Sequence, residues 1–210
     1  MTMIKVIASS SKGNAILYNS IVLVDIGVSY KKIQEYASKI KVVFLTHKHS
    51  DHLKIRTLKA LCRNPPKIHV ASGEWMVEHL DGIINPIDVL EIGKWYDYGL
   101  FNVSIGKLYH DVPNAFFRFD FNGYKIFHET DTAHLKGITA KDYDLYALEH
   151  NYCEEKAQQI IEEASSKRTY THLAYSINSH LSVQQAHEWL LSNMNKNSEV
   201  VRLHESTTAL

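Results

Sequence analysis

Short apolar runs that end in turn-forming residues follow one another along the chain, and runs of this length predict strands. The clearest is KVVFLT at residues 41–46, whose β-branched side chains suit a strand covered on both faces. In the first half of the chain the expected strands are residues 4–9, two strands within 15–27 around an Asn19-Ser20 turn, 41–46, 67–72 and 86–92. In the second half they are residues 101–110, 115–121, 124–129, 145–150 and 199–204.

Helical periodicity, with apolar side chains three and four residues apart, separates several of these strands. It is strongest at residues 152–166, which carry one apolar stripe. Other helices are expected at residues 29–40, 52–63 and 73–80. A further helix is expected to begin near Ser182, because Ser182 and Gln185 form a capping-box pattern.

Strands that alternate with helices are typical of an α/β protein. Asn122-Gly123, between two expected strands, suits a type I′ hairpin turn. No internal repeat, low-complexity segment or shift in composition marks a linker. Residues 1–210 are therefore expected to form one α/β domain, with sheets inside and helices outside.

The composition is that of an ordinary globular protein, with 45% apolar and 22% charged residues. Basic and acidic residues balance at 23 each, so net charge gives no argument for a nucleic-acid partner. Cys62 and Cys153 predict no disulfide framework, and no apolar run is typical of a signal peptide or a membrane span. We therefore expect a cytoplasmic protein, bacterial or phage-encoded, with no membrane partner.

Histidine is the compositional outlier, with 13 residues, and the segment FLTHKHSDHL at 44–53 holds three of them. His47, His49, Asp51 and His52 follow directly after the expected strand 41–46. In extended backbone His47 and His49 point to one side, whereas the adjacent Asp51 and His52 do not both share that direction. Four ligand-type side chains at one strand end favour a metal site over a solvated loop, with one ion for each pair.

Further ligands are expected where other strands end, because functional side chains collect at such edges. The candidates are His110, Asp131 and His180, and Asp131 is the choice for a carboxylate that bridges two ions. A ligand set of nitrogen and oxygen suits zinc, and also iron or manganese when carboxylates take part. Two divalent ions are expected, with zinc as the default.

The segment THKHSDH resembles the H-x-H-x-D-H signature of the metallo-β-lactamase superfamily of hydrolases. Four other segments match the remaining motifs of that family in order: Asp25 in VLVDIG, His110 in YHD, Asp131 in ETDTAH and His180 in SHLS. The resemblance runs from about residue 5 to residue 190. It implies an αββα four-layer sandwich, the metallo-β-lactamase fold.

The same resemblance implies how the ligands divide between two metal ions. His47, His49 and His110 hold one ion. Asp51, His52 and His180 hold the other, and Asp131 bridges them. Asp25 is expected to orient a ligand histidine from behind.

Within the superfamily the segments ASSSKGNAILY, VDIGVS, ETDT and HLS are most similar to a compact branch associated with DNA exonuclease or phosphodiesterase activity. The resemblance implies a hydrolase that acts on DNA, RNA or a small phosphodiester through a metal-bridging hydroxide, since paired cations lower the pKa of water. A small-molecule hydrolase of thioesters, lactones or cyclic nucleotides uses the same metals, and the motifs do not separate the two. The oligomeric state is left open, with a dimer among the alternatives.

Proton transfer needs further groups. Asp51 is a candidate to receive the proton of the attacking water. His150, at the end of strand 145–150, and His134, three residues after Asp131, are candidates for protonation of the leaving group or contact with phosphate. A packed or surface histidine is the simpler interpretation of each one alone. The remaining histidines have no motif context and are interpreted as structural: His69, His79, His172, His187 and His204.

Overall fold

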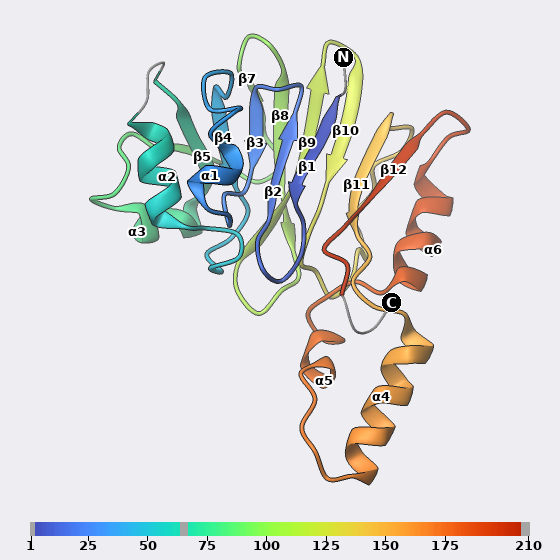
Figure 1. Cartoon of the computed structure of the whole chain (residues 1–210). Coiled ribbons are helices and arrows are strands. Elements are labelled where there is room, and N and C mark those ends of the chain that lie inside the picture. The colour runs from blue at the N-terminus through green and yellow to red at the C-terminus, as the bar shows by residue number, and fades with distance from the viewer. Residues whose placement is uncertain (1–2, 64–66, 207–210) are drawn as a thin grey trace. The chain divides into compact units, whose positions relative to one another are not determined.

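The computed structural model of the chain describes residues 3–63 and 67–206. These residues divide into two compact units, 1–94 and 95–210, and each unit is built on its own mixed sheet (Figure 1). Among the described residues, no helix is long and apolar enough to cross a membrane.

The sheet of the first unit combines antiparallel and parallel pairing. Its strands are β1 (Ile4–Ala8), β2 (Ala15–Tyr18), β3 (Val22–Val24), β4 (Val42–Leu45), β5 (His69–Gly73) and β6 (Asp88–Leu90), in that spatial order. β1 to β3 pair antiparallel, whereas β3 to β6 pair in parallel. Asn19 and Ser20 have positive φ angles of 46° and 63°, so the expected tight turn is confirmed.

The helices of the first unit are short. They are α1 (Tyr30–Ile33), α2 (Ile55–Cys62), the 3₁₀ helix η1 (Glu74–Met76) and α3 (Val77–Leu80). The expected helix at residues 29–40 is wrong beyond its first turn. After Ile33 the amides of Tyr36, Ala37 and Lys39 bond to the carbonyls three residues back, which gives tight turns in place of an α-helix. The apolar periodicity there still buries Ile33 and Ile40, so the pattern predicted burial but not the backbone.

The sheet of the second unit also combines both kinds of pairing. Its strands are β7 (Trp95–Asp97), β8 (Asn102–Leu108), β9 (Asn114–Phe121), β10 (Tyr124–His128), β11 (Leu145–Glu149) and β12 (Glu199–Leu203), in the order β12-β11-β10-β9-β8-β7. β7 to β10 pair antiparallel, and β10 to β12 pair in parallel. Asn122 and Gly123 form the predicted hairpin turn, with φ angles of 55° and 96°.

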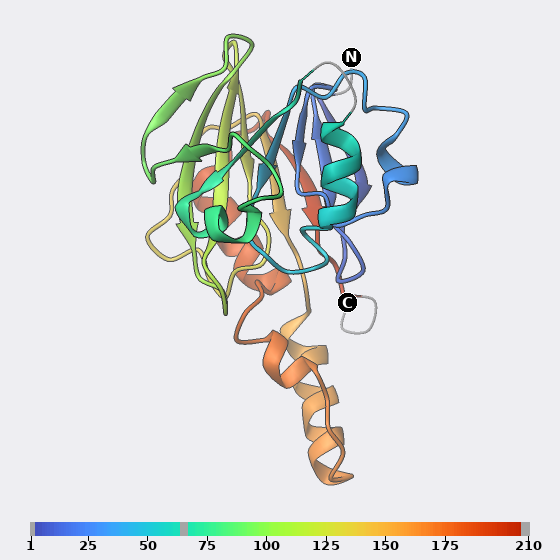
Figure 2. The same cartoon turned by 90° about the vertical axis from the view of Figure 1, so that its left-hand side faces the viewer.

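The helices described in the second unit are α6 (Val183–Asn193), which packs against β11, and α4 (Glu154–Ser166) and α5 (Leu173–Ser176), which pack against each other. α6 begins with the predicted capping box at Ser182 and buries Ala186 and Leu190 in the same apolar cluster as Tyr146 and Leu148 of β11. α4 and α5 extend away from the end of β11, as Figures 1 and 2 show. Residues 154–176 are called the arm below.

Parallel pairing explains why chemically useful side chains gather at one edge of each sheet. In the second unit β10, β11 and β12 run in the same direction, so their carboxyl ends meet at one edge. Asp131 follows β10, Glu149 ends β11 and His204 follows β12. In the first unit Asp25 follows β3 and His47 follows β4, which are likewise parallel neighbours.

Candidate metal centre

The histidine motif of the first unit begins where β4 ends. Nε2 of His47 lies 3.1 Å from Nδ1 of His49, and the two rings meet edge-on with centroids 4.7 Å apart. Two nitrogen ligands of a tetrahedral zinc ion lie roughly 3.3 Å apart, since each is about 2.0–2.1 Å from the metal. The two nitrogens therefore already have the spacing of ligands that share one cation.

The buried carboxylate of Asp25 sets the tautomers of two motif histidines. It accepts a hydrogen bond from Nδ1 of His52 at 2.6 Å and another from the hydroxyl of Thr46 at 2.8 Å. The Thr46 hydroxyl has one proton, which it donates to Asp25, so it accepts from Nδ1 of His47 at 2.9 Å. In both histidines Nδ1 carries the proton and Nε2 keeps its lone pair, as a metal ligand requires.

A second polar residue, Asn14, fixes the remainder of the motif. Its side-chain amide donates to Nε2 of His52 at 2.8 Å and lies 3.3 Å from a carboxylate oxygen of Asp51. The acceptor role of Nε2 agrees with the tautomer set by Asp25. Gly27 allows this packing, because a Cβ there would lie 1.6 Å from the carbonyl oxygen of Asp51.

The second unit brings four ligand-type side chains together. Asp131, Glu149, His180 and His204 each offer one ligand atom, and these atoms all lie within 4.8 Å of one another. Nδ1 of His204 lies 3.4 Å from a carboxylate oxygen of Asp131 and 3.1 Å from one of Glu149. Nδ1 of His180 lies 3.9 Å from a carboxylate oxygen of Asp131 and 2.6 Å from one of Glu149. The donor set is that of a divalent cation site with nitrogen and oxygen ligands.

His110 lies close to this cluster, at the end of β8. Its Nδ1 donates to the carbonyl of Ser179 at 3.0 Å, which leaves Nε2 on the side of Asp131, 4.0 Å from a carboxylate oxygen. Burial lowers the pKa of His110, and this effect outweighs the charge of Asp131. His110 is therefore neutral at physiological pH, the form that binds a metal.

Two buried glutamates, Glu149 of this cluster and its neighbour Glu129, have pKa values that shift in opposite directions. Burial, and then the neighbouring charge of Glu149, raise the pKa of Glu129 well above its usual range. Burial alone would also raise the pKa of Glu149, but the charge and hydrogen bond of His180 outweigh it and lower that pKa. Burial alone would lower the pKa of His180, but the charge and hydrogen bond of Glu149 outweigh this effect and raise that pKa. Glu149 and His180 thus form an ion pair.

Left-handed backbone occurs at residues of both clusters. Asp25, Asp131 and His204 have φ angles of 60°, 59° and 51°. Such angles are uncommon outside glycine and concentrate where surrounding structure holds a functional residue in place. His204 shares this backbone with two residues that the motifs had already indicated, although turn residues elsewhere in the chain, such as Asn122 and Asp142, adopt it as well.

The structure adds His204 and Glu149 to the residues of interest. His204 was interpreted as structural from the sequence, yet it belongs to the ligand-type cluster around Asp131. A signal was present, since His204 lies within two residues of the end of a strand, as His47 and His110 do. Glu149 carried no signal, because it is an acidic residue within the buried run LYALE.

His150 lies apart from the candidate ligands. Its Nδ1 donates to the carbonyl of Leu148 at 3.0 Å, and its ring meets that of His187 at a centroid distance of 5.6 Å. It lines a cavity of about 660 Å³ beside α6, and none of the candidate ligands is among the described residues that line this cavity. Successive strand residues face opposite sides, so Glu149 faces the cluster and His150 faces away. This placement does not favour His150 as the proton donor.

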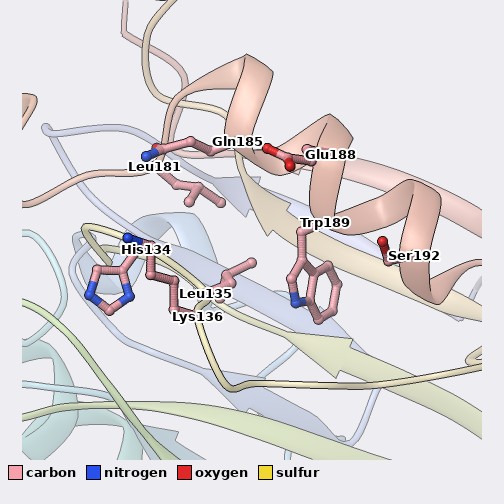
Figure 3. Close-up of a pocket in the computed structure, with 8 residues that line it drawn as sticks. All are labelled: His134, Leu135, Lys136, Leu181, Gln185, Glu188, Trp189 and Ser192. Atoms are coloured by element: carbon pink, nitrogen blue, oxygen red, sulfur yellow. The ribbon is translucent and has the colours of Figure 1, made fainter.

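His134 lies in a different environment. Its ring lies against that of Tyr109, tilted by 39° at a centroid distance of 4.1 Å, and it lines a cavity of about 350 Å³. Figure 3 shows the loop of His134 and Lys136 on one side of this cavity and Glu188 and Trp189 of α6 on the other. Contact between His134 and a substrate phosphate therefore remains a prediction.

Comparison with known families identifies the chain. A family model described as a beta-lactamase superfamily domain matches residues 22–204. The protein therefore belongs to the beta-lactamase superfamily, and the predicted relation to the metallo-β-lactamases is confirmed. This superfamily consists of metal-dependent hydrolases. No curated protein matches the chain significantly.

Several solved structures share the fold. The metallo-β-lactamase fold protein YhfI from Bacillus subtilis has a TM-score of 0.78 and 16% identity, over 99% of this chain and 87% of that one. Human tRNase Z, short form, has a TM-score of 0.68 and 15% identity, over 97% and 92% of the two chains. A diphosphatase of the PhnP family has a TM-score of 0.69 and 12% identity, over 98% and 86%. The predicted α/β sandwich of mixed sheets and helices is confirmed.

Replacement of Asp25 tests whether the buried carboxylate orients the metal ligands. In Asp25→Asn the amide no longer accepts from both Thr46 and His52, so the tautomers of the ligand histidines are no longer fixed. We expect zinc affinity to fall about 10- to 100-fold, measured by isothermal titration of metal-free protein. The matched control is Asp81→Asn, an exposed carboxylate of the same unit. Equal zinc affinity in Asp25→Asn and the parent protein would contradict this role.

His150 gives a prediction for the pH dependence of stability. Burial lowers the pKa of His150, with smaller contributions from Arg202 and His187. The unfolded chain therefore binds a proton at this histidine below a pH of about 6.5, whereas the folded protein binds it only at lower pH. The free energy of unfolding consequently falls as the pH falls below about 6.5. In metal-free His150→Gln the drop in unfolding free energy between pH 7.5 and pH 5.5, measured with urea, should be smaller than in the parent. An equal drop in both would show that His150 does not contribute.

Proposed function

We propose that the protein is a two-metal hydrolase of phosphodiesters, most directly of nucleic acid. The observation that carries the proposal is the gathering of Asp131, Glu149, His180 and His204 at one sheet edge, with ligand atoms within 4.8 Å of one another. A cluster of this size combines buried carboxylates with imidazoles, and a divalent cation is the partner that satisfies both. Membership of a superfamily of metal-dependent hydrolases supports the same function.

The ligand set follows the family motifs, with one change. By those motifs His47, His49 and His110 would hold one ion, Asp51 and His52 would hold the second, and Asp131 would be a ligand common to both. For the last histidine ligand, which the motifs assign to His180, the geometry favours His204. His204 is 3.4 Å from Asp131, whereas His180 is 3.9 Å away and is held at 2.6 Å by Glu149.

When bound, two divalent ions would acidify a water molecule and neutralise charge on phosphate oxygens. The protein's own groups hold the ligands and move protons. Asp25 and Asn14 hold His52 with Nε2 as an acceptor. The side chain of Asp51 is 22% exposed, so it can receive a proton from an attacking water. His180 keeps its proton through Glu149, and we assign it to protonation of the leaving group.

Phosphodiesters are favoured over acyl substrates by the relatives that share the fold. One is a tRNase Z and another is a diphosphatase, so related scaffolds act on phosphate linkages. Zinc is the metal we propose, because imidazole predominates among the ligands. The second candidate is a small-molecule hydrolase, and the net charge of zero favours it, since strong polyanion binders are usually basic.

The proposed function is tested by hydrolysis of labelled single- and double-stranded DNA, RNA and bis(p-nitrophenyl) phosphate, with Zn(II) and Mn(II) supplied separately. We expect cleavage of a polymer, and we expect Asp131→Asn to lower the rate about a thousandfold or more, because a ligand proposed to serve both ions would be lost. Asparagine is chosen because it tolerates the left-handed backbone at this position.

Asp142→Asn is the matched control, because Asp142 has the same φ angle of 59° but is an exposed residue of another loop. It should keep the parental rate. Cleavage of thioesters or lactones with no cleavage of any phosphate would replace the proposal with the second candidate. Equal phosphodiester cleavage by Asp131→Asn and the parent would contradict the site.

A further inference from the structure

A cleft of about 640 Å³ opens in the second unit directly beside the candidate ligand His110. One wall is formed by the end of β8 and the residues after it, and the other by α5 and the turn that follows it. The hydrogen bond from Nδ1 of His110 to the carbonyl of Ser179 joins the two walls. The volume is in the range of sites that bind small organic groups. The cleft thus leads from the metal ligands towards the arm.

Exposed tyrosine rings line both walls of this cleft. Tyr109 is 45% exposed and Tyr175 is 69% exposed. Each ring is supported by another: His134 lies on Tyr109 at 4.1 Å, and Tyr170, itself 66% exposed, lies 6.0 Å from Tyr175. His172 continues the series, with its ring 4.9 Å from that of Tyr170. Aromatic rings therefore continue from the neighbourhood of the metal ligands along the arm.

Charge in and near the cleft is mixed. Lys107 and Asp111 both line it, and their charges oppose each other. On the arm Lys167 lies 3.3 Å from the carboxylate of Glu163. A ligand would therefore gain little from neutralisation of a phosphate backbone. The surface that the cleft offers is aromatic, and its natural partners are flat rings that stack.

We propose that this aromatic cleft binds the unpaired bases of a single-stranded nucleic acid whose backbone passes the metal centre. The proposal rests on the proposed function for the position of the scissile phosphate, and it adds a preference for single strands. Bases in a duplex are stacked on one another and are not free to insert between side chains, whereas unpaired bases stack on tyrosine and histidine. Tyr109 and Tyr175 are the residues that set this preference.

Binding is measured by fluorescence anisotropy of a labelled 12-nucleotide strand, alone and annealed to its complement. The full chain is used with Zn(II) in the Asp131→Asn background, where turnover is not expected. We expect the single strand to bind at least about tenfold more tightly than the duplex. Tyr109→Ala and Tyr175→Ala should each raise Kd about tenfold, the effect of one lost base stack. Tyr175→Trp should retain the affinity, because indole also stacks.

The matched control is Trp95→Ala in β7, which removes a 54% exposed aromatic ring outside the cleft and should leave Kd unchanged. The salt dependence gives an independent check. Because few cations line the cleft, log Kd should change with log salt concentration with a slope below about 2, as for contact with fewer than about three phosphates of a single strand.

The outcomes separate this inference from the proposed function. Strand binding that depends on Tyr109 and Tyr175, with no hydrolysis of any phosphodiester, would support the cleft and contradict the proposed function. Hydrolysis with unchanged Kd in both tyrosine variants would overturn the cleft, as would equal affinity for single strand and duplex. The chain could also self-associate in a way that Tyr175→Ala abolishes while nucleic-acid binding is unchanged. That result would assign the tyrosines to a protein interface and overturn the inference.

Discussion

The second unit depends on one buried carboxylate, that of Glu149. It is fully buried, and it accepts hydrogen bonds from the amides of Thr132 and Leu181 at 3.1 and 3.0 Å. It also contacts Nδ1 of His180 at 2.6 Å and of His204 at 3.1 Å. A buried charge is costly unless it is fully paired, so each of these groups is held where it is. Three separate segments of the chain are thereby joined at the edge where parallel strands end.

The first unit uses the same device with a different residue. Asp25 is buried at the end of β3 and holds His52 directly and His47 through the hydroxyl of Thr46. In each unit a carboxylate therefore stands behind the imidazoles and fixes the nitrogen that carries the proton. Buried hydrogen bonds thus orient these candidate ligands, as the residues behind the ligands of a metal site do.

The sequence predicted those features that depend on interactions between neighbouring residues. The Asn122-Gly123 hairpin, the capping box at Ser182 and the histidine motif after β4 were all predicted, because turn chemistry, caps and strand ends leave signals in neighbouring residues. β7 and α5 were not predicted, since three- and four-residue elements carry too little periodicity. Glu149 was missed because only tertiary structure, through the pairing of β10, β11 and β12, makes a buried glutamate useful. His204 was missed because it lies in none of the family motifs, although its position directly after a strand was a usable signal.

The central claim is that the histidines and carboxylates at the strand ends of the two sheets bind metal ions. The metal content of the purified protein tests this claim most directly. Elemental mass spectrometry after dialysis against zinc-buffered solution should find two divalent ions per chain, consistent with a two-metal centre. His204→Ala should lower that number, whereas His69→Ala, which removes an exposed histidine outside both clusters, should not. A protein that binds no metal, or that binds the same amount without His204, would contradict the account.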